Sequence, residues 1–142
     1  MDNIIKLSYI VDGDNFTSAG EASSSMKKAL RQLGVAPEII RRVAIAMYEG
    51  EINMVIHANG GEALVEITPQ YIKVILKDNG PGIKDIDLAM KEGYSTACEK
   101  ARQMGFGAGM GLPNMKSYTD EMNITTKMGV GTTVEMIIYT KC

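Results

Sequence analysis

The chain has 142 residues, of which 45% are hydrophobic and 23% charged, and its formal net charge is -2 at pH 7. This length fits a single domain over residues 1–142 with a proper core, and the small net charge gives no overall basic field for nucleic acid or anionic lipid. No apolar run approaches the roughly 18 residues of a membrane helix, and the acidic start Met1-Asp2-Asn3 differs from a signal peptide. We therefore expect a cytoplasmic protein that binds neither nucleic acid nor membrane.

The first part of the chain predicts one strand followed by two helices. Residues 4–11 have the composition of a strand and lead into a cluster of turn residues. Ser18 and Glu21 have the spacing of a capping box, which predicts the start of a helix that ends at Gly34. A second helix is predicted over residues 37–58, and its first half is apolar on most sides, as in a buried helix.

The second predicted helix carries a polar stripe. Glu49 and Asn53 are four residues apart and His57 follows after another four, so the three share one face, whereas Glu51 points elsewhere and is expected to be a surface acid. The stripe is either a solvated face near the helix end or a face turned towards a ligand. For a ligand, the amide oxygen of Asn53 suits Mg²⁺, and a carboxylate at Glu49 can orient or deprotonate an attacking hydroxyl.

Two strands are predicted next, at residues 62–68 and 71–78, and the second ends in an acid. Because side chains alternate along a strand, Asp78 shares the core-facing side with the apolar residues before it. A carboxylate in that position needs a hydrogen-bond donor, which an exocyclic amino group such as that of adenine would supply. The segment 78–82, Asp-Asn-Gly-Pro-Gly, is also a strong turn signal that requires no ligand.

The last part of the chain predicts a short helix at 85–92, a stretch without clear period at 93–110, a helix at 111–119 and a hairpin of strands at 122–127 and 132–139. The whole order is strand, two helices, two strands, loop, helix, two strands. This order differs from the strict alternation of a doubly wound fold. It predicts an α/β protein in the sense of an α+β two-layer sandwich, with a mixed, mostly antiparallel sheet and helices on one face.

Glycine alternates with other residues over 105–111, immediately before the last predicted helix. Such glycines permit positive φ and close approach of a ligand to the backbone, and the N-terminus of a helix favours phosphate. The run is neither a P-loop, since no Gly-Lys-Ser/Thr follows, nor a dinucleotide fingerprint, since Met110 and Leu112 stand where the third glycine belongs. The alternative is a flexible hinge without a ligand, which does not explain why the run adjoins a helix start.

Together these motifs resemble the ATP site of the GHKL superfamily, which includes gyrase, Hsp90, sensor histidine kinases and anti-sigma kinases, and whose Bergerat fold fits the predicted order of elements. The compact length and the string Glu-Gly-Tyr-Ser-Thr at 92–96 resemble most the anti-sigma and stress-switch serine kinases. The matching segments are Glu49-x-x-x-Asn53 for the N box, Asp78-x-Gly80-x-Gly82 for the G1 box, Gly107-x-Gly109-x-Gly111 for the G2 box and Gly129-x-Gly131-Thr132 for the closing segment.

The resemblance implies the cofactors ATP and Mg²⁺ and a role for each matching residue. Asp78 would bind the adenine amino group, Asn53 would hold Mg²⁺ and Glu49 would act as the catalytic base. Residues 93–110 would form the ATP lid. The other nucleotide-binding residues would be Gly80, Gly82 and Thr132 at the base, Gly105, Gly107, Gly109 and Gly111 at the phosphates, and the lid cations Lys100 and Arg102, either of which could meet the γ-phosphate.

Three functional classes fit the resemblance. The first, which we favour, is a serine/threonine protein kinase that transfers the γ-phosphoryl group of ATP to a small antagonist protein. The second is a nucleotide-gated module that sequesters a partner such as a sigma factor without efficient transfer, and the third is the catalytic half of a split sensor kinase. A carboxylate at Glu49 favours a kinase or an ATPase over pure binding, without separating these two. A protein partner is expected, and the family often forms homodimers.

Overall fold

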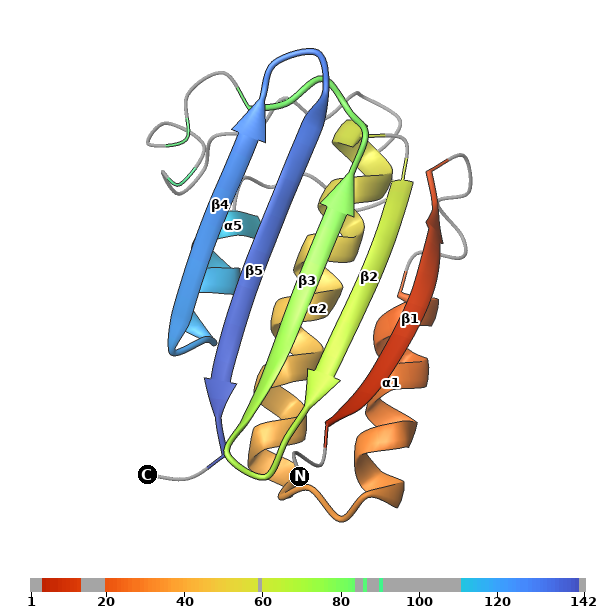
Figure 1. Ribbon diagram of the computed structural model, residues 1–142, viewed down its shortest axis with the longest axis vertical. Helices are drawn as coiled ribbons and strands as arrows, with labels where there is room; N and C mark the ends of the chain where they lie inside the picture. The colour runs from red at the N-terminus through yellow and green to blue at the C-terminus, as the bar shows by residue number, and fades with distance from the viewer. Residues whose placement is uncertain are drawn as a thin grey trace.

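Figure 1 shows the computed structural model of the chain, which describes residues 4–13, 20–58, 60–83, 86, 90 and 111–140. Its elements follow the predicted order. Most of residues 84–110 lies outside the described part of the chain, and so does most of the predicted short helix at 85–92. No helix within the described ranges is long and apolar enough to span a membrane. The elements are β1 (Ile5–Asp12), α1 (Glu21–Gln32), α2 (Pro37–Ala58), β2 (Gly60–Ile67), β3 (Tyr71–Asp78), α5 (Gly111–Ser117), β4 (Glu121–Lys127) and β5 (Gly131–Tyr139).

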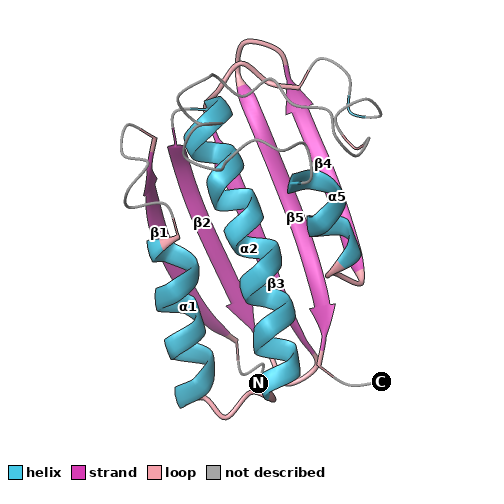
Figure 2. Cartoon of the chain, turned by 180° about the vertical axis from the view of Figure 1, so that it is seen from behind, coloured by secondary structure: helices cyan, strands magenta, loops and turns pink. Residues whose placement is uncertain are grey.

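The five strands form one sheet in the order β1-β2-β3-β5-β4. Helices α1, α2 and α5 lie together on one face of this sheet (Figure 2), which confirms the predicted two-layer α/β architecture. The sequence allowed a mixed sheet, but every pair of neighbouring strands described is antiparallel. Short turns join β2 to β3 and β4 to β5, and such hairpin connections impose antiparallel pairing.

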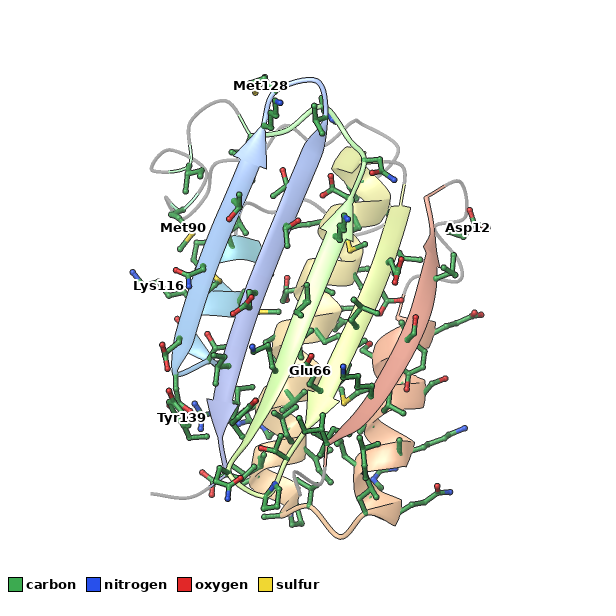
Figure 3. All side chains as sticks on the ribbon, in the orientation of Figure 1. Asp12, Glu66, Met90, Lys116, Met128 and Tyr139 are labelled. Carbon is green, nitrogen blue, oxygen red and sulfur yellow. The ribbon has the colours of Figure 1, made fainter. Side chains whose placement is uncertain are left out.

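The core lies between the helix layer and the inner face of the sheet. On β3, Ile72, Val74 and Leu76 are at most 2% exposed, so the alternation predicted from the sequence is confirmed. The other face of the sheet carries charged and polar side chains such as Glu66 (Figure 3). Methionine fills much of the core, as suits its flexible side chain. Within the described ranges, five methionines are at most 3% exposed: Met26, Met47, Met54, Met115 and Met136.

Helix α1 ends as the sequence predicts. Gly34 has a φ of 77°, and its N–H donates to the carbonyl oxygen of Arg31 at 3.1 Å. The N–H of Val35 donates to the carbonyl oxygen of Leu30, also at 3.1 Å. These two bonds form a Schellman motif, which needs a left-handed residue at the position of Gly34.

The start of α1 differs from the prediction. The helix begins at Glu21 with Gly20 as its N-cap residue, whereas the predicted capping box needs Ser18 in that position. The predicted capping box of Ser18 and Glu21 is therefore wrong, and Ser18 itself lies outside the described residues. The first turn is capped instead by Glu51, which lies 31 residues further along the chain than Gly20, in α2. The local spacing that predicted a capping box could not reveal a cap supplied by a different helix.

The carboxylate of Glu51 accepts three backbone hydrogen bonds, from the N–H groups of Gly20 at 2.7 Å, Ala22 at 3.2 Å and Ser23 at 3.1 Å. Its side chain is only 2% exposed, so the prediction of a surface acid at this position is wrong. A buried carboxylate is tolerated here because several N–H donors and the N-terminal end of a helix dipole stabilise its charge. Glu51 therefore fixes α1 against α2.

We expect a Glu51→Gln substitution to lower the free energy of unfolding by about 2 kcal/mol, because the amide group leaves at least one of the three N–H donors facing another donor. Urea denaturation measures this loss. The matched control is Glu38→Gln, an exposed glutamate in the first turn of the same helix, for which a loss below about 1 kcal/mol is expected. Equal losses in the two variants would contradict the cap.

Candidate functional site

Two residues of the polar stripe of α2, Glu49 and Asn53, face helix α5. Asn114 donates from Nδ2 to Oε1 of Glu49 at 3.5 Å, and Asn53 donates from Nδ2 to the sulfur of Met115 at 3.9 Å. The side chains of Glu49 and Asn53 are half-buried. With its nitrogen directed at Met115, Asn53 keeps its amide oxygen out of any hydrogen bond to the described residues, so this oxygen can serve as a hard ligand.

The environment of Glu49 changes its acidity. Burial raises the pKa of the Glu49 carboxyl above its ordinary value of 4.5, and the hydrogen bond from Asn114 lowers the pKa by a smaller amount. The net direction is upwards, because removal from water disfavours the charged form. A carboxylate with a raised pKa is a stronger base than a free glutamate, so the arrangement suits proton abstraction.

Asp78 lies at the end of β3 and is bound by the backbone. Its Oδ1 accepts hydrogen bonds from the N–H of Gly80 at 2.9 Å and from the N–H of Thr132 at 3.0 Å. The first bond closes the predicted turn after the strand, as an aspartate often does. Both bonds that the described residues make to this carboxylate fall on the same oxygen, so Oδ2 retains its full capacity to accept from a ligand.

Two glycines flank Asp78, one on each neighbouring strand. A Cβ at Gly131 of β5 would lie 2.1 Å from the carbonyl oxygen of Asp78, and a Cβ at Gly61 of β2 would lie 2.3 Å from the carbonyl oxygen of Lys77. Both distances are far below van der Waals contact. Only glycine allows the two strands to approach the end of β3 this closely, so these residues determine where the carboxylate lies.

The turn after Asp78 is held by the hairpin of β4 and β5. The N–H of Ile83 donates to Oγ1 of Thr126 at 2.8 Å, and this hydroxyl also bonds the hydroxyl of Thr132 at 3.0 Å. The N–H of Gly129 donates to the carbonyl oxygen of Pro81 at 2.9 Å. These bonds hold the turn in one position beside Asp78.

Close packing at Gly50 brings the turn of α2 that carries Glu49 against β3, the strand that ends in Asp78. A Cβ at Gly50 would lie 2.0 Å from Cδ1 of Leu76 and 3.0 Å from Cε of Met115. Helix α2 therefore contacts β3 and α5 through the same residue, one position after Glu49. This contact places the helix turn that carries Glu49 directly over the end of β3.

The described structure covers seven of the predicted site residues. Glu49 and Asn53 lie on α2, Asp78, Gly80 and Gly82 lie at the end of β3 and in the turn that follows, Gly111 is the first residue of α5, and Thr132 is buried on β5. The other predicted site residues, Lys100, Arg102, Gly105, Gly107 and Gly109, lie outside the described residues, as does the side chain of His57.

Three further residues shape the site without having been predicted: Asn114, Met115 and Thr126. Asn114 and Met115 lie three and four residues after the last glycine of the run, and their place in the first turns of α5 was the one signal that could have indicated them. Thr126 has no comparable signal, because its role depends on the pairing of β4 with β5.

Comparison with known proteins identifies related chains. The family described as histidine kinase-like ATPase domain matches residues 15–138. The serine/threonine-protein kinase RsbT of Bacillus subtilis (strain 168) is 30% identical over 115 residues, which cover 78% of this chain and 80% of that protein. An anti-sigma F factor of Caldanaerobacter subterraneus subsp. tengcongensis is 27% identical over 143 residues, which cover 97% of this chain and 94% of that protein.

Two solved structures share the fold. The RsbU and RsbW domains of a Mycobacterium tuberculosis protein superpose with a TM-score of 0.65 at 16% identity, over 94% of this chain and 31% of that one. The mycobacterial sensor histidine kinase MprB superposes with a TM-score of 0.54 at 14% identity, over 95% of this chain and 97% of that one. At these identities the likeness is one of fold.

Proposed function

Because this chain belongs to the family of histidine kinase-like ATPase domains, as its sequence motifs predicted, we propose that it binds ATP with Mg²⁺ and phosphorylates a serine or threonine of a small regulatory protein. The relatives named as a serine/threonine-protein kinase and as anti-sigma F factors support this class of regulator. The observation that carries the proposal is Asp78, whose backbone donors share Oδ1 while Oδ2 can accept from a ligand.

The residues fit ATP in two respects. An adenine amino group is a donor that Oδ2 of Asp78 can accept, within a site too close-packed for a Cβ at Gly131. Asn53 would hold Mg²⁺ through its amide oxygen, since its nitrogen is directed at Met115. When bound, Mg²⁺ neutralises negative charge on the phosphates. The glycines at 105–111 would contact the phosphates, and residues 93–110 would act as the lid.

The role of Glu49 in the proposed reaction is that of the base. It would accept the proton of the hydroxyl as that oxygen bonds to the γ-phosphorus, while the bond from phosphorus to the bridging oxygen breaks and ADP leaves. Its half-buried place on α2 and its raised pKa support this role.

A second candidate function is a nucleotide-gated binding module without efficient phosphoryl transfer. The similarity to anti-sigma F factors, which extends over 97% of the chain, favours this candidate. The two functions share the ATP site and differ in the fate of the γ-phosphate.

One experiment separates them. The immobilised protein is used to capture its partner and is then incubated with ATP labelled at the γ-phosphate. A labelled partner supports the kinase, an unlabelled partner retained only with ATP supports the binding module, and free labelled phosphate alone indicates an ATPase. Absence of ATP binding would refute both candidates.

We expect a Glu49→Gln substitution to leave ATP affinity within about threefold of the wild type while turnover falls by about 100-fold or more, as for loss of a general base. Calorimetry with ATP and Mg²⁺ measures the first quantity, and labelled phosphate release or transfer measures the second. The matched control, Glu66→Gln, changes a glutamate on the open face of the sheet (Figure 3) and should retain full turnover. Wild-type turnover in Glu49→Gln would remove Glu49 from the mechanism.

The raised pKa of Glu49 also predicts the direction of pH dependence. A base acts deprotonated, so wild-type turnover should rise with pH through a pKa above the ordinary 4.5, and this rise should be absent from Glu49→Gln.

The raised pKa of Glu49 also affects stability, because it favours the protonated form of the carboxyl in the folded state. Its contribution to stability is therefore present below the pKa of the unfolded chain and lost as pH rises through the folded pKa. Glu49→Gln should accordingly be at least as stable as the wild type at pH 8.

A further inference from the structure

Two consecutive side chains of α5 contact Glu49 and Asn53 of α2. Asn114 donates to Glu49, and Met115 accepts from Asn53. Glu49 and Asn53 are one helical turn apart, so each of the two α5 residues meets one of them. The base proposed above thus receives its side-chain hydrogen bond from the helix that follows the glycine run.

Helix α5 is held firmly enough to direct Asn114. Met115 is 0% exposed, and a Cβ at Gly50 would lie 3.0 Å from its Cε, so α5 packs tightly against α2 at this point. In addition, Arg42 of α2 donates from Nε to the carbonyl oxygen of Tyr118, just beyond the end of α5, at 3.2 Å. The helix is therefore anchored at Met115, next to Asn114, and again at Tyr118, one turn further along.

We propose that Asn114 is a positioning residue, which orients the carboxylate of Glu49 for proton abstraction through the bond from Nδ2 to Oε1. This inference rests on the proposed function of the site. A glutamate side chain has several rotatable bonds, and a general base is effective only when held within hydrogen-bond reach of its proton. The bond also opposes the effect of burial on the Glu49 carboxyl, because it favours the charged form.

The first test is a double-mutant cycle on turnover. Asn114→Leu, which keeps the size of the side chain and removes the donor, should lower turnover about tenfold with ATP affinity unchanged. In a Glu49→Gln background the same substitution should have no further effect, since there is no base left to orient. An equal loss in both backgrounds would overturn the proposal and assign Asn114 a purely structural role.

The matched control lies on the same helix. Lys116 is exposed and points away from the domain (Figure 3), so Lys116→Ala should keep wild-type turnover. A tenfold loss in this variant would mean that any change to α5 disturbs the site, which would also overturn a specific role for Asn114.

The second test needs neither nucleotide nor activity. A double-mutant cycle of Glu49→Ala and Asn114→Ala, measured by urea denaturation of the free protein, should give a coupling clearly different from zero, because the two side chains are in contact. Zero coupling would overturn the inference at its geometric basis. A wild-type protein that binds ATP but shows no turnover would instead refute the kinase, and the positioning role with it, whatever the coupling.

Discussion

The Asp78→Asn variant should fold like the wild type and lose its ATP-dependent stabilisation. Asparagine has the same shape, and its Oδ1 can still accept from the N–H groups of Gly80 and Thr132. Its amide nitrogen replaces Oδ2, so a donor would face the adenine amino group, which is itself a donor. We expect ATP affinity to fall by about 100-fold, because the charged acceptor Oδ2 is lost and the adenine amino group is left without an acceptor.

The measurement is the melting temperature with and without ATP and Mg²⁺. At ATP concentrations up to about ten times the wild-type Kd, the wild type should show a shift that grows with ATP concentration, and Asp78→Asn should show none. Asp120→Asn is the matched control, because Asp120 forms an ion pair with Arg42 at 3.1 Å on the surface. It should keep the full shift. A shift in Asp78→Asn equal to that of the wild type would exclude Asp78 from the nucleotide site.

The Gly131→Ala variant should lose both stability and ATP affinity. A Cβ at this position would lie 2.1 Å from the carbonyl oxygen of Asp78 and 3.0 Å from its carbonyl carbon, and the backbone there cannot give way as a flexible side chain would. Either β5 or the end of β3 must shift, so Asp78 moves with it. We expect the free energy of unfolding to fall by about 3 kcal/mol, as for overpacking in a close-packed region.

The chain provides a control two residues away. Gly129, at the tip of the same hairpin, also has a positive φ, 77°, but a Cβ there would meet nothing within 4 Å. Gly129→Ala should therefore cost only about 1 kcal/mol of backbone strain and keep ATP affinity. Equal behaviour of the two variants in urea denaturation and ATP calorimetry would show that close approach at Gly131 does not determine the site.

Much of the fold could be predicted from the sequence because its signals are local. The alternation along β3, the Schellman motif at Gly34 and the proline that opens α2 each depend on a few neighbouring residues. The side predicted for Asp78 followed from counting along the strand, and the burial of Leu76, two residues before it, agrees with the alternation on which that count depends. The motif spacing likewise predicted the family to which the chain belongs.

The predictions that were wrong concerned contacts between distant segments. The capping box of Ser18 and Glu21 has a valid local pattern, yet the cap of α1 comes from Glu51. The same contact explains why Glu51, which was expected to be a surface acid, is buried. The sequence around a helical glutamate does not indicate whether its carboxylate will accept bonds from three N–H groups at the start of another helix.

The sequence by itself determined the elements, their order and the chemical types available for an ATP site, because periodicity and glycine spacing are properties of short segments. Only the tertiary structure decided which polar groups meet: Glu51 with α1, Asn114 with Glu49, and Thr126 with Thr132. Such pairs depend on how the helices and strands pack, and packing is set by close approaches such as those at Gly50 and Gly131 that no local pattern encodes.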